Sequence, residues 1–248
     1  MPLAIRQFPC LADNYGFLIR DEASGKTATI DTPDVAAILK ELGKAGWTLD
    51  YILNTHWHPD HAGGNAELKE KTGAIAIGPS EVTKIAPLDG VVSDGDVFNL
   101  GETALTVMDV GGHTLGHIAY YDAADHVAFV GDALFTLGCG RLFEGSPEQM
   151  WQSLSRLAAL PDETAVYCAH EYTAANARFA LSVDDGPALK ARAAEIFALR
   201  EKDIPTVPTT IGAEKAANPF LRAPVLRPNL APARAFAEIR AAKDVFKG

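Results

Sequence analysis

The stretch "THWHPDH", Thr55–His61, places three of the chain's seven histidines and one aspartate within seven consecutive residues. A single histidine after a strand is usually a surface or hydrogen-bonded residue. Imidazoles this crowded repel one another when they are protonated, so the cluster costs stability unless it binds a cation. Trp57 and Pro59 alternate with the ligand candidates, and Pro59 fixes the backbone φ angle of the loop. The stretch therefore predicts a metal site on a rigid loop.

Further candidate ligands also follow predicted strands. Short runs rich in Val, Ile, Tyr, Phe and Ala predict strands at 15–19, 27–31, 51–53, 74–78, 104–110, 118–122, 127–132 and 165–169. The histidine cluster follows the strand at 51–53, and His113 follows the strand at 104–110. Asp132 closes a third strand, and His170 follows a fourth. Four strands thus deliver metal-capable side chains just past their ends, which is how rigid scaffolds present a site.

Helical periodicity appears between these strands and dominates the end of the chain. It predicts helices at 33–46, 63–73, 146–161, 173–183, 187–203 and 232–248, with a connector at 204–210 and a loop at 218–229. Strands and helices are mixed up to residue 172, whereas the Ala-rich remainder is helical. We expect an α/β or α+β sandwich over residues 1–172 and a helical C-terminal domain over residues 173–248.

Composition and charge exclude several classes of protein. The chain has 248 residues, of which 48% are hydrophobic, so it can bury a sizeable core. No apolar run reaches the roughly 20 residues that span a bilayer. Residues 1–172 carry 10 Lys and Arg against 24 Asp and Glu, which argues against a nucleic-acid partner. Residues 173–248 carry 12 against 8, so this basic part is the better place for an anionic ligand.

Location and assembly follow from weaker signals. The first residues lack the charged and apolar regions of a signal peptide. Three cysteines without close pairing argue against a disulfide framework. We therefore expect a cytoplasmic protein without a membrane partner. No apolar stripe marks an oligomer interface, so we expect a monomer.

The candidate ligands are nitrogen and oxygen donors without a cysteine. Imidazole with carboxylate suits zinc, iron or manganese better than copper(I) or an iron–sulfur cluster. One tetrahedral zinc takes four ligands, so five histidines and two aspartates are too many for a single ion. They suit two ions about 3.5–4 Å apart that share a carboxylate, an arrangement that holds a hydrolytic nucleophile. His117 and His126 stay outside this set as structural residues.

The motifs resemble those of a known superfamily. "THWHPDH", "GHTLGH" (112–117), "GD" (131–132) and "AHEYT" (169–173) are similar to the metallo-β-lactamase superfamily. Other stretches resemble the hydroxyacylglutathione hydrolase, or glyoxalase II, family within it: "DNYGFLI" (13–19), "GCGRLFEGSPEQM" (138–150), "PTVPTT" (205–210), "NPFLR" (218–222) and "IRAAKDVF" (239–246). The resemblance covers nearly the whole chain and implies an αββα sandwich with the metals at one edge of the sheets.

The resemblance also implies a role for each ligand. One divalent ion is expected to take His56, His58 and His113. The other ion is expected to take Asp60, His61 and His170. Asp132 and a water or hydroxide would bridge the two ions.

The implied substrate is a small-molecule glutathione thioester. The family pattern implies five substrate-binding residues, namely Arg141, Phe143, Tyr172, Arg240 and Lys243. Some family members have lysine in place of Arg141 and tyrosine in place of Phe143. Arginine still binds a carboxylate, and it does so in a bidentate manner. Arg240 and Lys243 are three residues apart on a predicted helix, so they share a face.

The implied reaction is hydrolysis of S-2-hydroxyacylglutathione thioesters, chiefly S-D-lactoylglutathione, to glutathione and D-lactate. This reaction is the second step of methylglyoxal detoxification. The implied nucleophile is the bridging hydroxide, whose parent water the ions make acidic, with a pKa near about 7. Asp132 would bridge the ions, and Asp60 would handle a proton.

Three other functions fit parts of the pattern. A persulfide dioxygenase of the same superfamily would use a single iron and would leave several of the donors unused, so the number of ions per chain separates it from the hydrolase. A nuclease of the same fold disagrees with the acidic charge balance. A non-catalytic metal-stabilised binding protein would not need the complete set of five histidines and two aspartates.

Overall fold

The computed structural model describes residues 3–248, which form two compact units. The first unit contains the described residues up to 109 together with 116–131. The second contains Val110–Leu115 and Asp132–Gly248. The sequence-based boundary at residue 172 divides the chain differently and stays a prediction.

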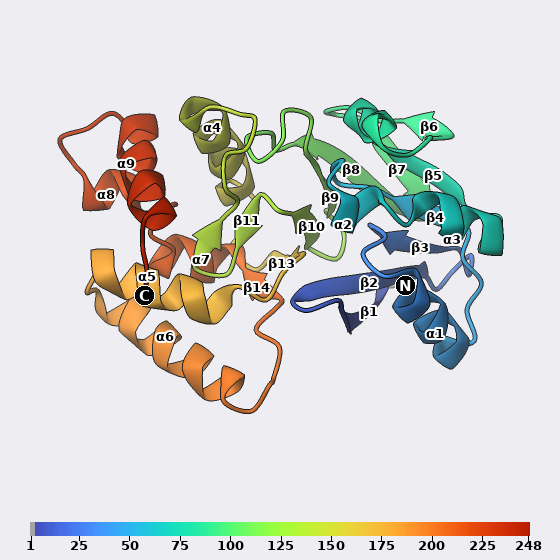
Figure 1. Cartoon of the computed structure of the whole chain (residues 1–248), viewed down its shortest axis with the longest axis horizontal. Coiled ribbons are helices and arrows are strands. Elements are labelled where there is room, and N and C mark those ends of the chain that lie inside the picture. The colour runs from blue at the N-terminus through green and yellow to red at the C-terminus, as the bar shows by residue number, and fades with distance from the viewer. Residues whose placement is uncertain (1–2) are drawn as a thin grey trace. The chain divides into compact units, whose positions relative to one another are not determined.

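A six-stranded sheet forms one layer of the first unit (Figure 1). Its strands are, in order, β1 (Leu3–Cys10), β2 (Asn14–Asp21), β3 (Thr27–Ile30), β4 (Tyr51–Leu53), β5 (Ile75–Gly78) and β6 (Gly90–Val91). β1, β2 and β3 are antiparallel, whereas β3 to β6 run parallel to one another. The parallel strands end at the same edge, so the loop after β4 that carries the histidine cluster leaves at this edge.

Four antiparallel strands of the second sheet complete the layers of the first unit. They are β7 (Val97–Leu100), β8 (Thr103–Asp109), β9 (Ile118–Asp122) and β10 (Val127–Gly131), in the order β10-β9-β8-β7. Aromatic side chains join the two sheets, because the Phe17 and Phe129 ring centroids lie 5.8 Å apart and Tyr51 meets Phe98 edge to face at 5.1 Å. Such contacts between the inner faces are the expected core of a sandwich.

Helical segments connect the strands of the six-stranded sheet. They are α1 (Val35–Ala45), α2 (Pro59–Ala62) and α3 (Asn65–Thr72), with a 3₁₀ helix at Ser80–Lys84. Asp34 caps α1 by accepting a hydrogen bond from Ala37 N, and Gly46 ends it at a φ of 67°. Ile38 and Leu68 are fully buried in the same cluster as Leu18 and Ile52 of the sheet. The apolar face of α1 and the single side chain of Leu68 from α3 thus complete this core.

The second unit begins with short strands and one long helix. Its elements are β11 (Leu134–Phe135), β12 (Gly138–Cys139), α4 (Pro147–Ala158) and β13 (Ala165–Cys168), and β13 pairs with β14 (Thr209–Thr210). Ser146 caps α4 by accepting a hydrogen bond from Gln149 N. Trp151 of this helix packs on Phe236 with ring centroids 6.4 Å apart.

Helices form the rest of the second unit. They are α5 (Thr173–Val183), α6 (Pro187–Arg200), α7 (Ile211–Ala217), α8 (Ala223–Leu226) and α9 (Pro232–Asp244). α5 and α6 lie side by side in Figure 1 and share a core of small side chains, including Ala177, Ala180 and Ala193. Alanine allows the two backbones to approach closely, which explains why both helices are Ala-rich. None of the helices in the described part of the chain is long and apolar enough to cross a membrane.

A buried carboxylate joins α7 to the β11–β12 turn. Glu214 is fully buried and accepts hydrogen bonds from Leu137 N (2.8 Å), Asn218 Nδ2 (2.9 Å) and Thr209 Oγ1 (2.6 Å). Asn218 in turn donates to the carbonyls of Phe135 and Gly138. Burial raises the pKa of Glu214, although the three hydrogen bonds oppose this shift. This network fixes the turn that lies between Asp132 and Arg141 in the sequence.

We expect Glu214→Ala to lower the free energy of unfolding by about 3–5 kcal/mol, because it leaves two buried donors, Leu137 N and Thr209 Oγ1, without an acceptor, at about 1–3 kcal/mol each. Urea denaturation monitored by circular dichroism measures the change. Glu195→Ala is the control, because Glu195 is exposed and, within the described residues, its carboxylate contacts only Arg192 in a surface ion pair. A loss below about 1 kcal/mol for Glu214→Ala would show that the network contributes little.

Most predicted elements are present, and the differences have local causes. All eight predicted strands and all six predicted helices are confirmed, with ends that move by a few residues. β1 was not predicted, because its exposure does not alternate and it contains Pro9, which an edge strand tolerates. The predicted loop at 218–229 is wrong over α8, a single helical turn that begins at Ala223 and has Pro224 as its second residue. α7 was also missed in the sequence analysis.

Candidate metal centre

The first unit contributes four of the predicted ligands from a single loop and turn. β4 ends at Leu53, and the chain then runs through His56 into α2, whose first residue is Pro59. The short helix brings Asp60 and His61 to one side, with Asp60 Oδ2 3.6 Å from His61 Nε2. His56 Nε2 and His58 Nδ1 lie 3.1 Å apart. The structure therefore brings the four donors of this unit together in two pairs.

Asp31 orients the His61 ring. Its Oδ2 lies 2.8 Å from His61 Nδ1, and it accepts hydrogen bonds from Thr55 N (2.7 Å) and Thr55 Oγ1 (2.8 Å). Because a carboxylate only accepts, His61 Nδ1 carries the hydrogen, and Nε2 keeps the lone pair that a metal needs. Asp31 is buried and has a φ of 59°, a strained conformation for a residue other than glycine. This residue was missed in the sequence analysis, although it ends a predicted strand.

His117 packs against the cluster within the same unit. Its ring stacks on His56 with centroids 4.5 Å apart and an angle of 18° between the planes. Gly131 has a φ of 49°, and a Cβ atom there would lie 2.8 Å from His117 Nε2. Glycine is therefore required next to this ring. His126 lies elsewhere, in the turn between β9 and β10.

The second unit contributes the other three predicted ligands. Asp132 Oδ2 lies 3.3 Å from His113 Nε2, and its Oδ1 lies 3.3 Å from His170 Nε2. All three side chains are buried. Each oxygen of the carboxylate thus faces a different histidine, which is the arrangement expected of a carboxylate that bridges two ions.

Neighbouring groups orient these histidines as well. His113 Nδ1 lies 2.8 Å from the carbonyl oxygen of Arg141, so Nδ1 carries the hydrogen and Nε2 is left as the donor atom. The Tyr172 ring stacks on His170 with centroids 4.7 Å apart and planes only 4° from parallel. Phe135 meets both of these rings edge to face. A predicted metal ligand and a predicted substrate residue are therefore held by the same aromatic group.

The donor sets of both units fit divalent metal ions. All donors are imidazole nitrogens or carboxylate oxygens, which suit zinc, iron or manganese. His61 and His113 each have the ring nitrogen opposite Nε2 engaged by an acceptor, so both present Nε2 lone pairs. Ring nitrogens and carboxylate oxygens only 3.1–3.6 Å apart are typical of ligands that converge on an ion.

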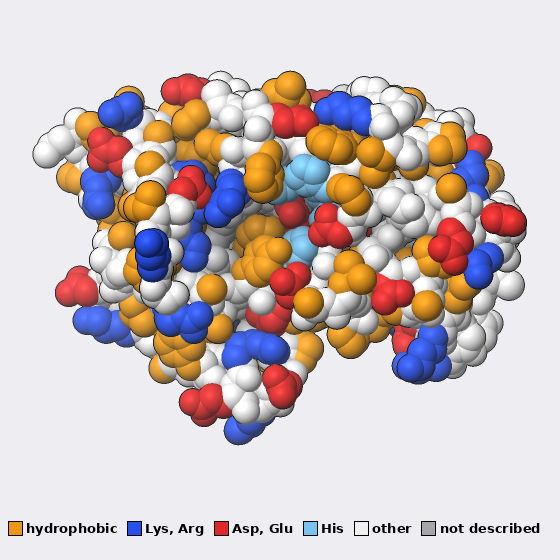
Figure 2. Space-filling view, viewed as in Figure 1, with side chains coloured by type: hydrophobic (Ala, Val, Ile, Leu, Met, Phe, Trp, Pro, Cys, Tyr) orange, Lys and Arg blue, Asp and Glu red, His pale blue; other side chains and the backbone are white. Residues whose placement is uncertain are grey.

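The predicted glutathione-binding residues gather in the second unit. Arg240 is buried, donates to Asp244 Oδ1 (2.9 Å) and to the Cys139 carbonyl (3.1 Å), and lies 5.0 Å from the Phe220 ring centroid. Arg141 Nε lies 3.7 Å from the same Asp244 oxygen, so one carboxylate joins the two arginines. Figure 2 shows Lys and Arg side chains gathered over the C-terminal helices, as the charge distribution predicts.

Phe143 and Tyr172 are exposed on the surface of this unit. The Phe143 ring is 60% exposed and meets His113 edge to face at 5.2 Å. The Phe143 N–H donates to the His113 carbonyl (3.2 Å), so this backbone donor is already engaged in a hydrogen bond with the loop that carries His113. The Phe143 carbonyl and ring are the groups through which this residue can meet a ligand.

The cysteines are structural. All three are buried free thiols. Burial raises the pKa of Cys10 and Cys168 to about 12 and that of Cys139 to about 11. Thiols with such pKa values are poor nucleophiles at neutral pH.

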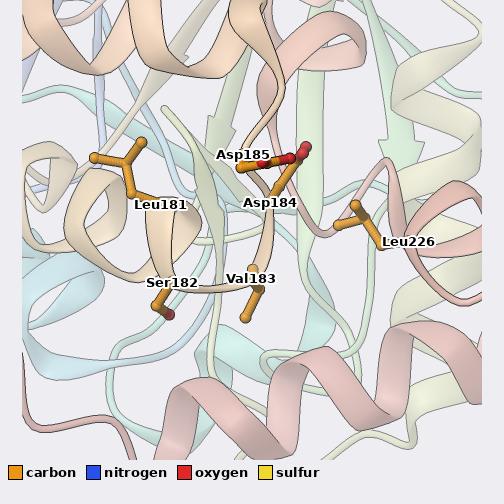
Figure 3. A pocket seen from close by; sticks show the side chains of 6 residues that line it. All are labelled: Leu181, Ser182, Val183, Asp184, Asp185 and Leu226. Carbon is orange, nitrogen blue, oxygen red and sulfur yellow. The ribbon is translucent and has the colours of Figure 1, made fainter.

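One cavity lies away from the predicted ligands. It measures about 310 Å³, and Figure 3 shows its lining from the end of α5 and from α8: Leu181, Ser182, Val183, Asp184, Asp185 and Leu226. Arg222 Nε donates to Asp184 Oδ2 (2.9 Å), and Gly186 N donates to Asp184 Oδ1. Both carboxylate oxygens of Asp184 therefore already accept hydrogen bonds that hold the connection between α5 and α6.

Comparison with known proteins gives a different family match for each of two parts of the chain. A model of the metallo-beta-lactamase superfamily matches residues 20–170, and a model of the hydroxyacylglutathione hydrolase C-terminus matches residues 171–246. Hydroxyacylglutathione hydrolase from Erythrobacter litoralis is 56% identical over 98% of this chain and 100% of its own length. The protein of the same name from Maricaulis maris is 56% identical over 98% of this chain and 99% of its length.

The chain belongs to the hydroxyacylglutathione hydrolase family. This places it among hydrolases of the metallo-beta-lactamase superfamily. Two solved structures share the fold. ETHE1 from Myxococcus xanthus has a TM-score of 0.73 and 26% identity over 98% of this chain and 92% of that chain. TTHA1623, solved in a di-iron-bound form, has a TM-score of 0.64 and 25% identity over 88% of this chain and 100% of that chain. The predicted family and fold class are confirmed.

Proposed function

We propose that this hydroxyacylglutathione hydrolase family member hydrolyses S-2-hydroxyacylglutathione thioesters, with S-D-lactoylglutathione as the leading substrate. Products are glutathione and D-lactate. The single observation that carries this proposal is the full-length identity of 56% to relatives named hydroxyacylglutathione hydrolase. The donor sets and the basic C-terminal helices support it.

We also propose that the chain binds two divalent ions. His56, His58 and His113 would hold one ion, and Asp60, His61 and His170 would hold the other. Asp132 would bridge the two, an assignment that agrees with its oxygens facing separate histidines. When bound, such ions supply Lewis-acid polarisation of the thioester and acidify water at neutral pH.

The side chains would bind the substrate and move a proton. The water oxygen bonds to the carbonyl carbon, the carbon–sulfur bond breaks, and a proton from the water passes to the sulfur. Asp60 is the proposed proton carrier, because it is only half-buried and Asn14 Nδ2 holds its Oδ2 at 3.1 Å. Arg141, Arg240 and Lys243 would bind carboxylates of the glutathione part, and Tyr172 and Phe143 would lie along it.

Direct assay of S-D-lactoylglutathione tests the reaction. We expect loss of thioester absorbance with release of one free thiol per turnover, and about two metal ions per chain by elemental analysis. Removal of the ions by a chelator should abolish turnover, and zinc, iron or manganese should restore it. Oxygen consumption with glutathione persulfide and a single bound iron would instead favour the dioxygenase alternative. Absence of thioester turnover with two ions bound would reject the proposal.

The remaining assignments accompany this function. We propose a catalytic domain over residues 1–172 and a glutathione-binding helical domain over residues 173–248. The change of family model between residues 170 and 171 supports this boundary. We also propose a cytoplasmic monomer, which agrees with three free thiols and is testable by light scattering.

A further inference from the structure

Arg178 is a cation close to Lys243, and none of the family motifs includes it. Lys243 Nζ reaches from α9 to α5, where it donates to the Ala175 carbonyl (3.1 Å). Arg178 follows Ala175 by three residues on α5, so the two share a face of the helix. The Phe179 ring centroid lies 5.3 Å from Lys243 Nζ and fixes the ammonium against the same helix. Arg178 and Lys243 therefore approach from two helices.

Among residues 3–248, no acidic side chain forms an ion pair with Arg178 or Lys243. Asp244 accepts from Arg240 and faces Arg141, so its carboxylate is shared by two other cations. Arg178 is exposed and forms no ion pair or hydrogen bond with any residue from 3 to 248. Lys243 uses only one of its three N–H donors within the same described residues. Arg240 and Arg141 thus share Asp244, whereas Arg178 and Lys243 form no ion pair within residues 3–248.

The proximity of these cations has a physical cost. Burial, then Arg240, then Arg178 lower the pKa of Lys243 to about 8, and this outweighs the opposing effects of Cys139 and Asp244. Like charges this close repel each other and destabilise the folded protein. An anion bound between Arg178 and Lys243 would turn this repulsion into attraction. A carboxylate suits this position, because guanidinium binds it through two N–H groups and ammonium through a third.

We propose that Arg178 and Lys243 together bind one of the two terminal carboxylates of the glutathione part of the substrate. This inference rests on the proposed function, and it adds α5 to the binding surface. Arg240 and Arg141, which already share Asp244, remain for the rest of the molecule. The N-terminal part of α5 would then contribute two substrate contacts, from Tyr172 before its first turn and from Arg178 in its second.

The test uses Arg178→Met in the metal-loaded full chain. Arg234→Met is the control, because Arg234 is an exposed arginine of α9 that pairs with Glu238. We expect the Kd for S-methylglutathione, measured by calorimetry, and the KM for S-D-lactoylglutathione to rise about 10- to 100-fold in Arg178→Met, with kcat nearly unchanged. Arg178→Lys should recover part of the loss, and the control should match the wild type.

Modified substrates identify the carboxylate. Two arms are needed: the thioester esterified at the glycyl carboxylate, and the thioester of the dipeptide that lacks the γ-glutamyl group. The Arg178→Met penalty should vanish in one arm and persist in the other. A penalty that persists unchanged in both arms, or no penalty with the full substrate, overturns the inference.

The pH dependence supplies a second readout. Binding of S-methylglutathione to the wild type should weaken as pH rises through about 8, where Lys243 loses its charge. Arg178→Met removes a like charge and should move this fall to higher pH, because Arg240, Asp244 and Cys139 remain as the other neighbours. An unmoved profile contradicts the pairing. Failure of the wild type to bind or turn over any glutathione compound would reject the proposed function instead.

Discussion

Asp132→Asn should lower kcat for S-D-lactoylglutathione by about 10³-fold or more. The carboxylate presents one oxygen to His113 and the other to His170, each at 3.3 Å. Asparagine keeps the shape but offers a single oxygen, and its NH₂ group cannot bind a metal ion. If Asp132 bridges two ions as proposed, loss of one of its contacts would remove several kcal/mol of charge stabilisation, and each 1.4 kcal/mol is about tenfold in rate.

Metal content distinguishes this effect from misfolding. We expect Asp132→Asn to retain less metal per chain than the wild type while its circular dichroism spectrum stays the same. Asp162→Asn is the matched control in the second unit, because Asp162 is exposed and, among residues 3–248, its carboxylate forms an ion pair only with Lys215. Wild-type kcat and metal content in Asp132→Asn would exclude a bridging role.

Asp31→Asn is the second substitution for which we expect a large effect. Asparagine tolerates the φ of 59° at this position, so backbone strain is not increased. Its amide cannot accept from Thr55 N, Thr55 Oγ1 and His61 Nδ1 at the same time, so at least one buried donor loses its acceptor. We expect the free energy of unfolding of the metal-free protein to fall by about 2–3 kcal/mol. Metal affinity should fall about 10- to 100-fold, because His61 loses its orienting group.

Two measurements separate these consequences. Urea denaturation gives the stability of the metal-free protein, and competition with a chromophoric chelator gives metal affinity. Asp34→Asn is the control, because Asp34 caps α1 through one side-chain oxygen and asparagine caps a helix equally well. Unchanged metal affinity in Asp31→Asn would mean that the Thr55 contacts and the turn of α2 alone orient His61.

The elements that the sequence predicted well are those with strong local signals. The strands at 51–53 and 118–122 and the helix at 173–183 begin and end where periodicity and bounding residues indicate. Ser146 caps α4 because the capping hydrogen bond depends on residues only three apart. By contrast, β1 and α8 lack a local pattern, because an edge strand and a single helical turn acquire their structure from the chain around them.

The donor types were determined by the sequence itself. Crowded histidines after a strand indicate a metal whatever the fold, since imidazole chemistry and loop position are local properties. The family resemblance extended this to a substrate class, and full-length relatives confirmed the family.

Tertiary structure alone decided how the donors are held. The Asp31 contact to His61 joins residues 30 positions apart, and that of Arg141 to His113 joins residues 28 apart. The approach of Lys243 to α5 spans 68 positions. Such contacts have no periodic signature, because they arise where separate strands and helices meet. The sequence therefore indicated which side chains are candidate ligands, and the packing of distant segments decided which ring nitrogen of His61 and of His113 keeps its lone pair and which helices the basic side chain of Lys243 joins.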